Sequence, residues 1–271
     1  MVVVDTHCHV SPYWYEPVET LLYRMTTNAV DKAVLIQMGQ VRIFDNSYLI
    51  ECLRRFPGRF SAVAVVDTEI SDAPEQLEEW VKQGIEGIRL RSTLRSPGRD
   101  SLAIRRKAAE LGIVVSSQGT VGEFASPQFE EVIKEFPSLN VIIEHLGGGG
   151  QDTPPYDTYR RVLELAQYPN IFMKVPGLGE ISQRFVPFRQ PFPFEKVPPL
   201  IEMAMDAFGA QRLMWGSDFP PVAGRREGYR NALRLPMEHL HFKTQADKEW
   251  VFGKTATTLF RFGEYSLVGN G

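Results

Sequence analysis

Residues 2–12 read VVVDTHCHVSP, an apolar run that ends in an acid and two histidines before a Ser-Pro pair. An apolar run of this length, bounded by turn-forming residues, predicts a buried β-strand. Because residues two apart in a strand point to the same side, Asp5, His7 and His9 are expected on one face. Removing such a cluster from water costs free energy unless it binds a ligand or lies where solvent can reach it.

The same pattern, an apolar strand followed by a helical stretch, recurs along the whole chain. Seven further strands are predicted at residues 33–37, 60–66, 87–91, 113–118, 140–147, 170–175 and 212–218. Helical stretches, several opened by Asp, Ser or Pro in capping positions, are predicted at residues 46–56, 73–83, 101–111, 126–136 and 156–166.

Eight alternations of strand and helix predict a parallel sheet covered by helices. Closure into a (β/α)8 TIM barrel, a single domain over residues 1–271, fits the count and the length better than an open doubly wound sheet. No G-x-G-x-x-G follows the first strand, and the GGGG at residues 147–150 lacks the lysine of a P-loop. A dinucleotide-binding fold is therefore disfavoured.

Composition narrows the class of partner. The chain has 43% hydrophobic residues, a formal net charge of −3 and two cysteines, Cys8 and Cys52. It has no basic tract, no long apolar run and no basic-then-apolar start of the signal-peptide kind. We therefore expect a cytoplasmic protein with a small-molecule partner, and no nucleic acid or membrane partner.

In a (β/α)8 barrel, function lies where strands end, at the carboxyl-terminal face. His7 and His9 end the first predicted strand, His145 the sixth and Asp218 the eighth. His7, His9 and Asp218 could hold a divalent ion such as zinc with a position open for water. The ion would make hydroxide available at neutral pH, and Asp218 could accept the proton of the water.

Three motifs carry a family resemblance: DTHCH at residues 5–9, EHLGG at 144–148 and WGSDFP at 215–220. Together they resemble the amidohydrolase superfamily, specifically its amidohydrolase-related branch, which holds lactonases and non-oxidative decarboxylases. The resemblance runs from residue 4 to roughly residue 262. It implies a distorted (β/α)8 barrel, His7 and His9 as metal ligands, His145 as a further ligand or a group that polarises the substrate, and Asp218 as ligand or proton shuttle.

One departure from the family concerns the metal. Members with firmly bound zinc often place a histidine at the end of strand five, where this chain has SSQG at residues 116–119. Strand four has no lysine of the kind that bridges two metals in other branches. We expect one divalent ion, with zinc first, and keep a metal-independent mechanism as the alternative. In that mechanism Asp218 activates water and the histidines stabilise the oxyanion.

The basic residues suggest an anionic substrate. Arg89 and Arg91 alternate on the fourth predicted strand and would form a fork for a carboxylate if they face the barrel mouth. The alternative is that they point to the helix layer and pair with acids. Further candidates for substrate contact are Gln118, Lys174, Tyr13 and Trp14.

A segment rich in proline and phenylalanine, residues 177–199, is too long for an ordinary βα loop. It is expected to be a lid over the substrate or a contact in a homodimer or larger homo-oligomer.

These features predict a hydrolase that opens a lactone or related cyclic ester bearing a carboxylate, with Asp218 as base and His145 as electrophile, in aromatic or sugar-acid catabolism. A non-oxidative decarboxylase of an aromatic or muconate-type acid and an amide hydrolase are the alternatives within enzymes. A barrel that binds a ligand without catalysis is the alternative from another class.

Overall fold

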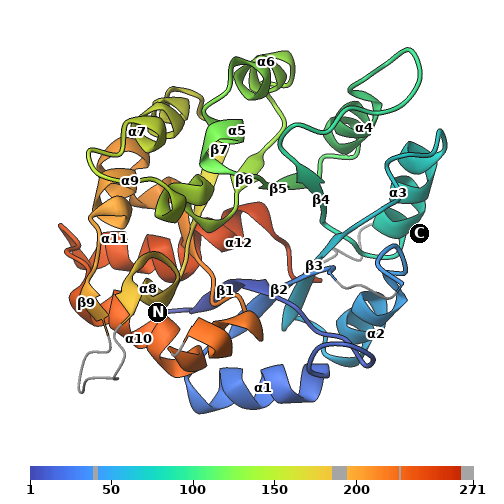
Figure 1. Cartoon of the computed structure of the whole chain (residues 1–271). Helices are drawn as coiled ribbons and strands as arrows, with labels where there is room; N and C mark the ends of the chain where they lie inside the picture. The colour runs from blue at the N-terminus through green and yellow to red at the C-terminus, as the bar shows by residue number, and fades with distance from the viewer. Residues whose placement is uncertain (39–41, 185–193, 226, 264–271) are drawn as a thin grey trace.

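The structure is a computed structural model that describes residues 1–38, 42–184, 194–225 and 227–263. Eight parallel strands form one sheet in the order β1 to β7 and then β10, arranged around a central axis (Figure 1). The strands are β1 (Val4–Cys8), β2 (Lys32–Ile36), β3 (Phe60–Ala64), β4 (Gly87–Arg91), β5 (Val114–Gln118), β6 (Val141–Ile143), β7 (Ile171–Val175) and β10 (Leu213–Trp215). The predicted eight-stranded barrel is confirmed.

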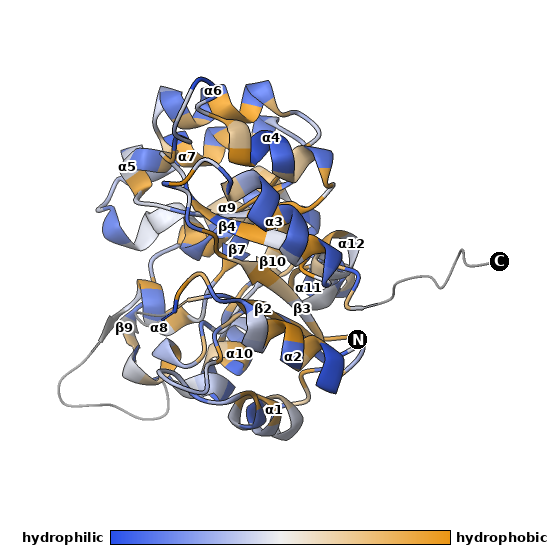
Figure 2. Cartoon of the chain, turned by 90° about the vertical axis from the view of Figure 1, so that its right-hand side faces the viewer, coloured by the Kyte–Doolittle hydropathy of each residue, from blue (hydrophilic) through white to orange (hydrophobic). Residues whose placement is uncertain are grey.

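Helices surround the strands (Figure 1). The five predicted helices correspond to α2 (Ser47–Arg55), α3 (Ala73–Lys82), α4 (Ala103–Glu110), α6 (Pro127–Glu135) and α7 (Asp157–Leu163). The others in the described residues are α1 (Val18–Thr27), α5 (Val121–Phe124), α8 (Leu178–Ile181), α9 (Leu200–Phe208), α10 (Gly228–His239), α11 (Gln245–Glu249) and α12 (Thr255–Leu259). Figure 2 shows apolar strands and helices with hydrophilic outer faces.

Apolar residues pack on both sides of the sheet. One cluster lies inside the barrel and the larger one lies between sheet and helices. Burial on both faces explains why the strands read as continuous apolar runs. Residues of the inner cluster include Val4, Val34, Ile142, Met214 and, from the C-terminal segment, Phe260. α12 and the residues after it thus pack into the amino-terminal end of the barrel, which leaves the carboxyl-terminal end for ligands.

The barrel closes between β1 and β10 by single hydrogen bonds rather than a regular ladder. The Asp218 amide donates to the His7 carbonyl at 2.9 Å, and the His9 amide donates to the Phe219 carbonyl at 2.8 Å. Gly216 permits this approach, since an added Cβ would lie 2.7 Å from the His7 Cβ. The seam therefore places the ends of the first and last strands side by side.

The segment at residues 177–199 begins with α8 and contains a two-stranded hairpin, β8 (Gln183–Arg184) with β9 (Phe194–Lys196). Residues 185–193, between the two strands, lie outside the described residues. The role of the segment as lid or oligomer contact stays a prediction. Among the described residues, no helix is long and apolar enough to span a membrane.

Candidate active site

Two histidines and an aspartate meet at the seam. The Nε2 atom of His9 lies 3.2 Å from Asp218 Oδ1, and the Nε2 atom of His7 lies 3.6 Å from the same oxygen. All three side chains are buried. Burial alone would raise the pKa of Asp218, but the hydrogen bond from His9 and the neighbouring histidines hold it well below its usual value. Asp218 is therefore a carboxylate at neutral pH.

Asp5 does not join this group, and the prediction that it shares a face with His7 and His9 is wrong. The pairing register of β1 with β2 shifts between Asp5 and Cys8, which breaks the alternation of side chains. The Asp5 Oδ1 atom instead accepts hydrogen bonds from the backbone amides of Ser217 at 2.8 Å and His7 at 3.2 Å. Asp5 thus holds the seam from behind the site.

A buried ion-pair network lies below the histidines, centred on Glu144. Arg89 donates to both carboxylate oxygens of Glu144, at 3.1 Å from Nε to Oε1 and 2.7 Å from Nη2 to Oε2. The Ser116 hydroxyl donates to Oε1 at 2.6 Å. Lys174 Nζ lies 3.8 Å from the same oxygen, 3.0 Å from Ser116 Oγ and 2.9 Å from His7 Nδ1. Residues from four strands therefore share one network.

The network shifts the pKa values of its members. Burial opposes ionisation of Glu144, but Arg89 and Lys174 outweigh it and hold the Glu144 pKa well below its usual value. Burial lowers the pKa of Lys174 to about 8, although Glu144 opposes the shift. Burial and the charge of Lys174 lower the pKa of His7, which is therefore neutral.

His145 faces the same cavity from the other side. Its Nδ1 atom lies 2.9 Å from Glu180 Oε1, and the second oxygen of Glu180 lies 2.9 Å from Arg225 Nη1. Arg225 also forms a short ion pair with Asp218. Burial lowers the pKa of His145, but Glu180 and then Asp218 outweigh it and the pKa is raised. Glu180 and Arg225 therefore link His145 on one side of the cavity to Asp218 on the other.

A left-handed turn positions His145. The sixth predicted strand, residues 140–147, stops at Ile143, and η1 (His145–Gln151) follows it. His145 and Leu146 both have φ of 51°, a conformation that costs energy for residues with a side chain. Gly147 and Gly148 continue the turn at φ of 58° and 72°. The glycine run is thus needed for the turn that aims His145.

These groups line a cavity of about 470 Å³, a size that suits a small molecule. His9, His145 and Asp218 lie on its wall, together with Arg89, Glu180 and Arg225. The structure therefore brings together the predicted residues His7, His9, Arg89, His145, Lys174 and Asp218.

Four predicted contact residues are not among those that line this cavity. Arg91, at the end of β4, is exposed. Gln118 is its register partner on the neighbouring strand β5. Tyr13 and Trp14 are 71% and 38% exposed. Tyr15 is the aromatic residue of this group that reaches the site, with its ring stacked on His9 at 5.7 Å between centroids.

Sequence reasoning missed three charged residues of the site, Glu144, Glu180 and Arg225. Glu144 had a signal, because it directly precedes His145 at the end of an apolar strand. Glu180 and Arg225 lie on short elements, α8 and η4 (Pro221–Arg225), and no strand pattern marks them.

The donor set fits a divalent ion. One possible ligand atom from each of His7, His9 and Asp218 lies within 4.8 Å of the other two. His7 Nε2 is buried and has no hydrogen-bond partner among the described residues. His9 Nδ1 lies 2.9 Å from the Ile36 carbonyl, which can only accept, so Nδ1 donates there and Nε2 is the atom of His9 that faces Asp218 and would reach a metal ion. Two imidazoles and a carboxylate are ligands that zinc accepts.

Comparison with known proteins identifies relatives over most of the chain. The family model described as Amidohydrolase matches residues 4–262. A stretch of 94 residues is 31% identical to an uncharacterised protein of Sinorhizobium fredii, covering 34% of this chain and 29% of that protein. An L-fucono-1,5-lactonase of Burkholderia ambifaria is 24% identical over 255 residues, which cover 80% of each chain.

Solved structures show the same fold. A probable 2-pyrone-4,6-dicarboxylic acid hydrolase of Acinetobacter baumannii superposes with a TM-score of 0.73 at 20% identity, over 97% of this chain and 100% of that one. An amidohydrolase of Burkholderia multivorans with bound zinc also gives 0.73, at 19% identity over the same shares. At these identities the likeness concerns the fold.

Proposed function

Because the chain belongs to the amidohydrolase family, we propose that it is a hydrolase that opens a lactone or related cyclic ester carrying a carboxylate. One observation carries the proposal. The ligand atoms of Asp218 and His145 lie within 4.8 Å of each other on one cavity, so an ionised base and a histidine with a raised pKa face the same small volume. Similarity to a lactonase and to a pyrone-dicarboxylic acid hydrolase supports the ester as the bond that is cleaved.

In the proposed reaction, Asp218 accepts a proton from the attacking water. The Nδ1 atom of His145 donates to Glu180, and in the imidazolium form, which Glu180 and Asp218 favour by raising the His145 pKa, Nε2–H donates to the carbonyl oxygen as negative charge develops there. Arg89 uses Nε and Nη2 for Glu144, and its remaining Nη1 binds the carboxylate of the substrate. Asp218 then returns the proton to the departing ring oxygen.

We assign one divalent ion to His7, His9 and Asp218, with zinc as the first candidate and His145 as a further candidate ligand. When bound, the ion would lower the pKa of a water ligand and polarise the carbonyl.

Three further assignments belong to the proposal. Residues 1–271 act as one catalytic domain in the cytoplasm, without a nucleic acid or membrane partner. The segment at residues 177–199 is a lid or a contact in a homodimer or larger homo-oligomer. The lid is supported by the place of α8, because Glu180 and Ile181 from this helix line the cavity.

A substrate panel tests the reaction. We expect proton release from five- and six-membered lactones that carry a carboxylate, and slower release from lactones without one. Asp218→Asn should lower kcat/KM by about 10³ to 10⁴, since a positioned base contributes about 10² to 10⁴ and the substitution also removes a charge next to three histidines. Asp206→Asn, which changes an exposed carboxylate on α9, is the matched control and should leave kcat/KM unchanged.

Other outcomes would replace the proposal. Release of CO₂ from hydroxybenzoates or muconate-type acids would identify a decarboxylase, and turnover of amides alone would identify an amide hydrolase. Ligand binding without any turnover would indicate a barrel that has lost catalysis. Full activity in Asp218→Asn would remove Asp218 as the base.

A further inference from the structure

Lys174 places a positive charge inside the candidate metal site. Its side chain rises from β7 into the barrel and is 2% exposed. The Nζ atom lies 2.9 Å from His7 Nδ1 and 3.0 Å from Ser116 Oγ. Its neighbours are thus a candidate metal ligand on one side and the Glu144 network on the other.

The direction of these hydrogen bonds follows from Ser116. Its hydroxyl has one hydrogen, which is donated to Glu144 Oε1 at 2.6 Å. Ser116 Oγ must therefore accept from Lys174. An ammonium has three hydrogens and no lone pair, so Lys174 also donates to His7 Nδ1, while Glu144 Oε1 lies 3.8 Å away as the anion that balances its charge.

The Nδ1 atoms of the two histidines consequently play opposite parts in their hydrogen bonds. His9 Nδ1 donates to the Ile36 carbonyl, and His9 Nε2 lies 3.2 Å from Asp218 Oδ1. His7 Nδ1 accepts from Lys174, so neutral His7 carries its hydrogen on Nε2, the atom that lies 3.6 Å from Asp218 Oδ1. A nitrogen that carries hydrogen cannot bind a metal ion.

We propose that Lys174 competes with the divalent ion for His7 and thereby sets the metal affinity of the site. This inference rests on the metal site of the proposed function but not on the substrate. While Lys174 donates to Nδ1, neither nitrogen of neutral His7 offers a lone pair to a metal ion. His7 becomes the third ligand when the ammonium leaves Nδ1 and the imidazole hydrogen moves there.

The first test measures metal binding by the whole protein. We expect Lys174→Met, which keeps chain length but removes the charge and the donor, to bind Zn²⁺ at least tenfold more tightly than the original protein in competition with a chromophoric chelator. Lys134→Met removes the same charge from an exposed lysine of α6, 57% exposed, and should not change the affinity. Equal or weaker Zn²⁺ binding by a folded Lys174→Met protein would overturn the proposal.

The second test needs no change at Lys174 and applies if that variant does not fold. Long-range ¹H–¹⁵N spectra of the metal-free protein labelled at its five histidines report which ring nitrogen carries hydrogen. We expect the hydrogen of His7 on Nε2 alone, with the His7 signals assigned from His7→Gln. A hydrogen on Nδ1 of His7 would refute the proposal. Neither readout involves a substrate, so a failed lactone assay leaves both tests intact.

Discussion

The two ends of the barrel each have a cavity and a buried glutamate, yet they differ in charge. The carboxyl-terminal cavity of about 470 Å³ lies above Glu144, which is paired with Arg89 and Lys174. The amino-terminal cavity of about 450 Å³ lies near Glu86, whose Oε2 accepts from the Ser61 hydroxyl at 2.9 Å and the Arg261 amide at 2.7 Å. Both glutamates are at most 4% exposed.

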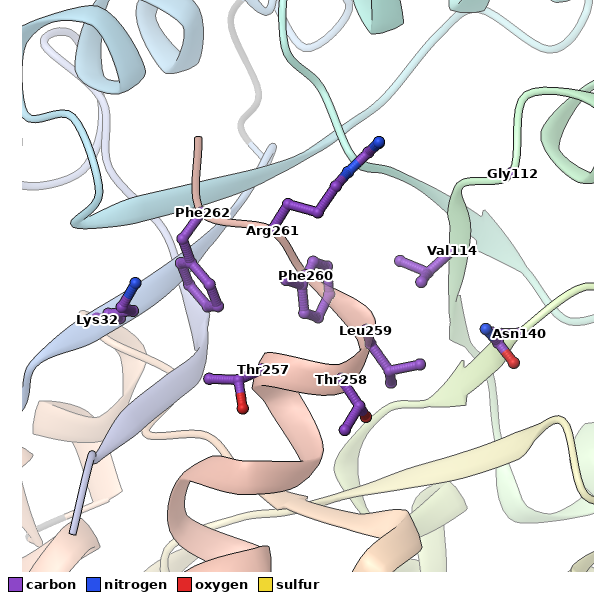
Figure 3. Close-up of a pocket in the computed structure, with 10 residues that line it drawn as sticks. All are labelled: Lys32, Gly112, Val114, Asn140, Thr257, Thr258, Leu259, Phe260, Arg261 and Phe262. Carbon is purple, nitrogen blue, oxygen red and sulfur yellow. The ribbon is translucent and has the colours of Figure 1, made fainter. Parts of the chain in front are cut away.

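The residues that line the amino-terminal cavity explain the difference in charge between the two ends of the barrel. Figure 3 shows Phe260, Arg261 and Phe262 on the C-terminal segment that lines it, with Lys32 at one side. Lys32 lies 4.9 Å from the centre of the Phe262 ring. Cavity size is therefore nearly equal at the two ends, and buried, paired charge distinguishes the candidate active site.

The largest expected effect on stability comes from Glu144→Gln. This change leaves Arg89 and Lys174 buried without their anion, and breaking a buried pair costs about 3 to 5 kcal/mol. Urea unfolding at pH 7 measures the free energy of unfolding. Glu110→Gln changes an exposed glutamate of α4 and is the matched control. A loss below about 1 kcal/mol would mean that the two ends bury charge equally well.

The stability difference between the original protein and Glu144→Gln depends on pH. The pKa of Glu144 is lower in the folded protein than in the unfolded chain, where it is about 4.3. Its contribution to stability is therefore fully present above that value and is lost as pH falls through the folded pKa. The stability difference between the original protein and Glu144→Gln should shrink below about pH 4.

The next effect concerns His145. We expect His145→Asn to lower kcat/KM about 100-fold, within the range for a positioned proton donor. The pKa of His145 is raised, so the donating form is lost only as pH rises through a value above 6.5. The original protein should lose activity on that alkaline side, and the variant should not show this limb.

An exposed histidine provides the control for this profile. His241→Asn changes a side chain outside the cavity and should leave the alkaline limb in place. If the alkaline limb persists in His145→Asn, another group controls it and His145 is not the electrophile.

Several features of the site were predictable because they depend on local sequence. Polar residues directly after apolar runs placed His7, His9, His145 and Asp218 at the carboxyl-terminal ends of strands. The count of eight strands and the chain length predicted the closed barrel, and the family motifs added its distorted form and the roles of these residues. Lys174 was predicted from its position on a strand, although its partner His7 was not.

Other features depend on contacts between distant residues or on irregular backbone. Arg89 and Glu144 are 55 residues apart, and no spacing rule predicts that one neutralises the other. The register shift in β1 turned Asp5 away from the histidines, because strict alternation fails at a bulge. Glu180 and Arg225 come from short elements whose place is set by packing on the barrel.

The smallest expected effect is that of Glu86→Gln at the amino-terminal end. Glutamine keeps an oxygen that accepts from Ser61 and Arg261, so the loss is the difference between charged and neutral hydrogen bonds, about 1 kcal/mol. Because Glu86 lies at the opposite end from Asp218, kcat/KM should stay within about twofold of the original value. Urea unfolding and lactone turnover on the same preparation measure both quantities. A tenfold loss of activity without a loss of stability would show that the C-terminal segment influences the site through the barrel, and the two ends would no longer be independent.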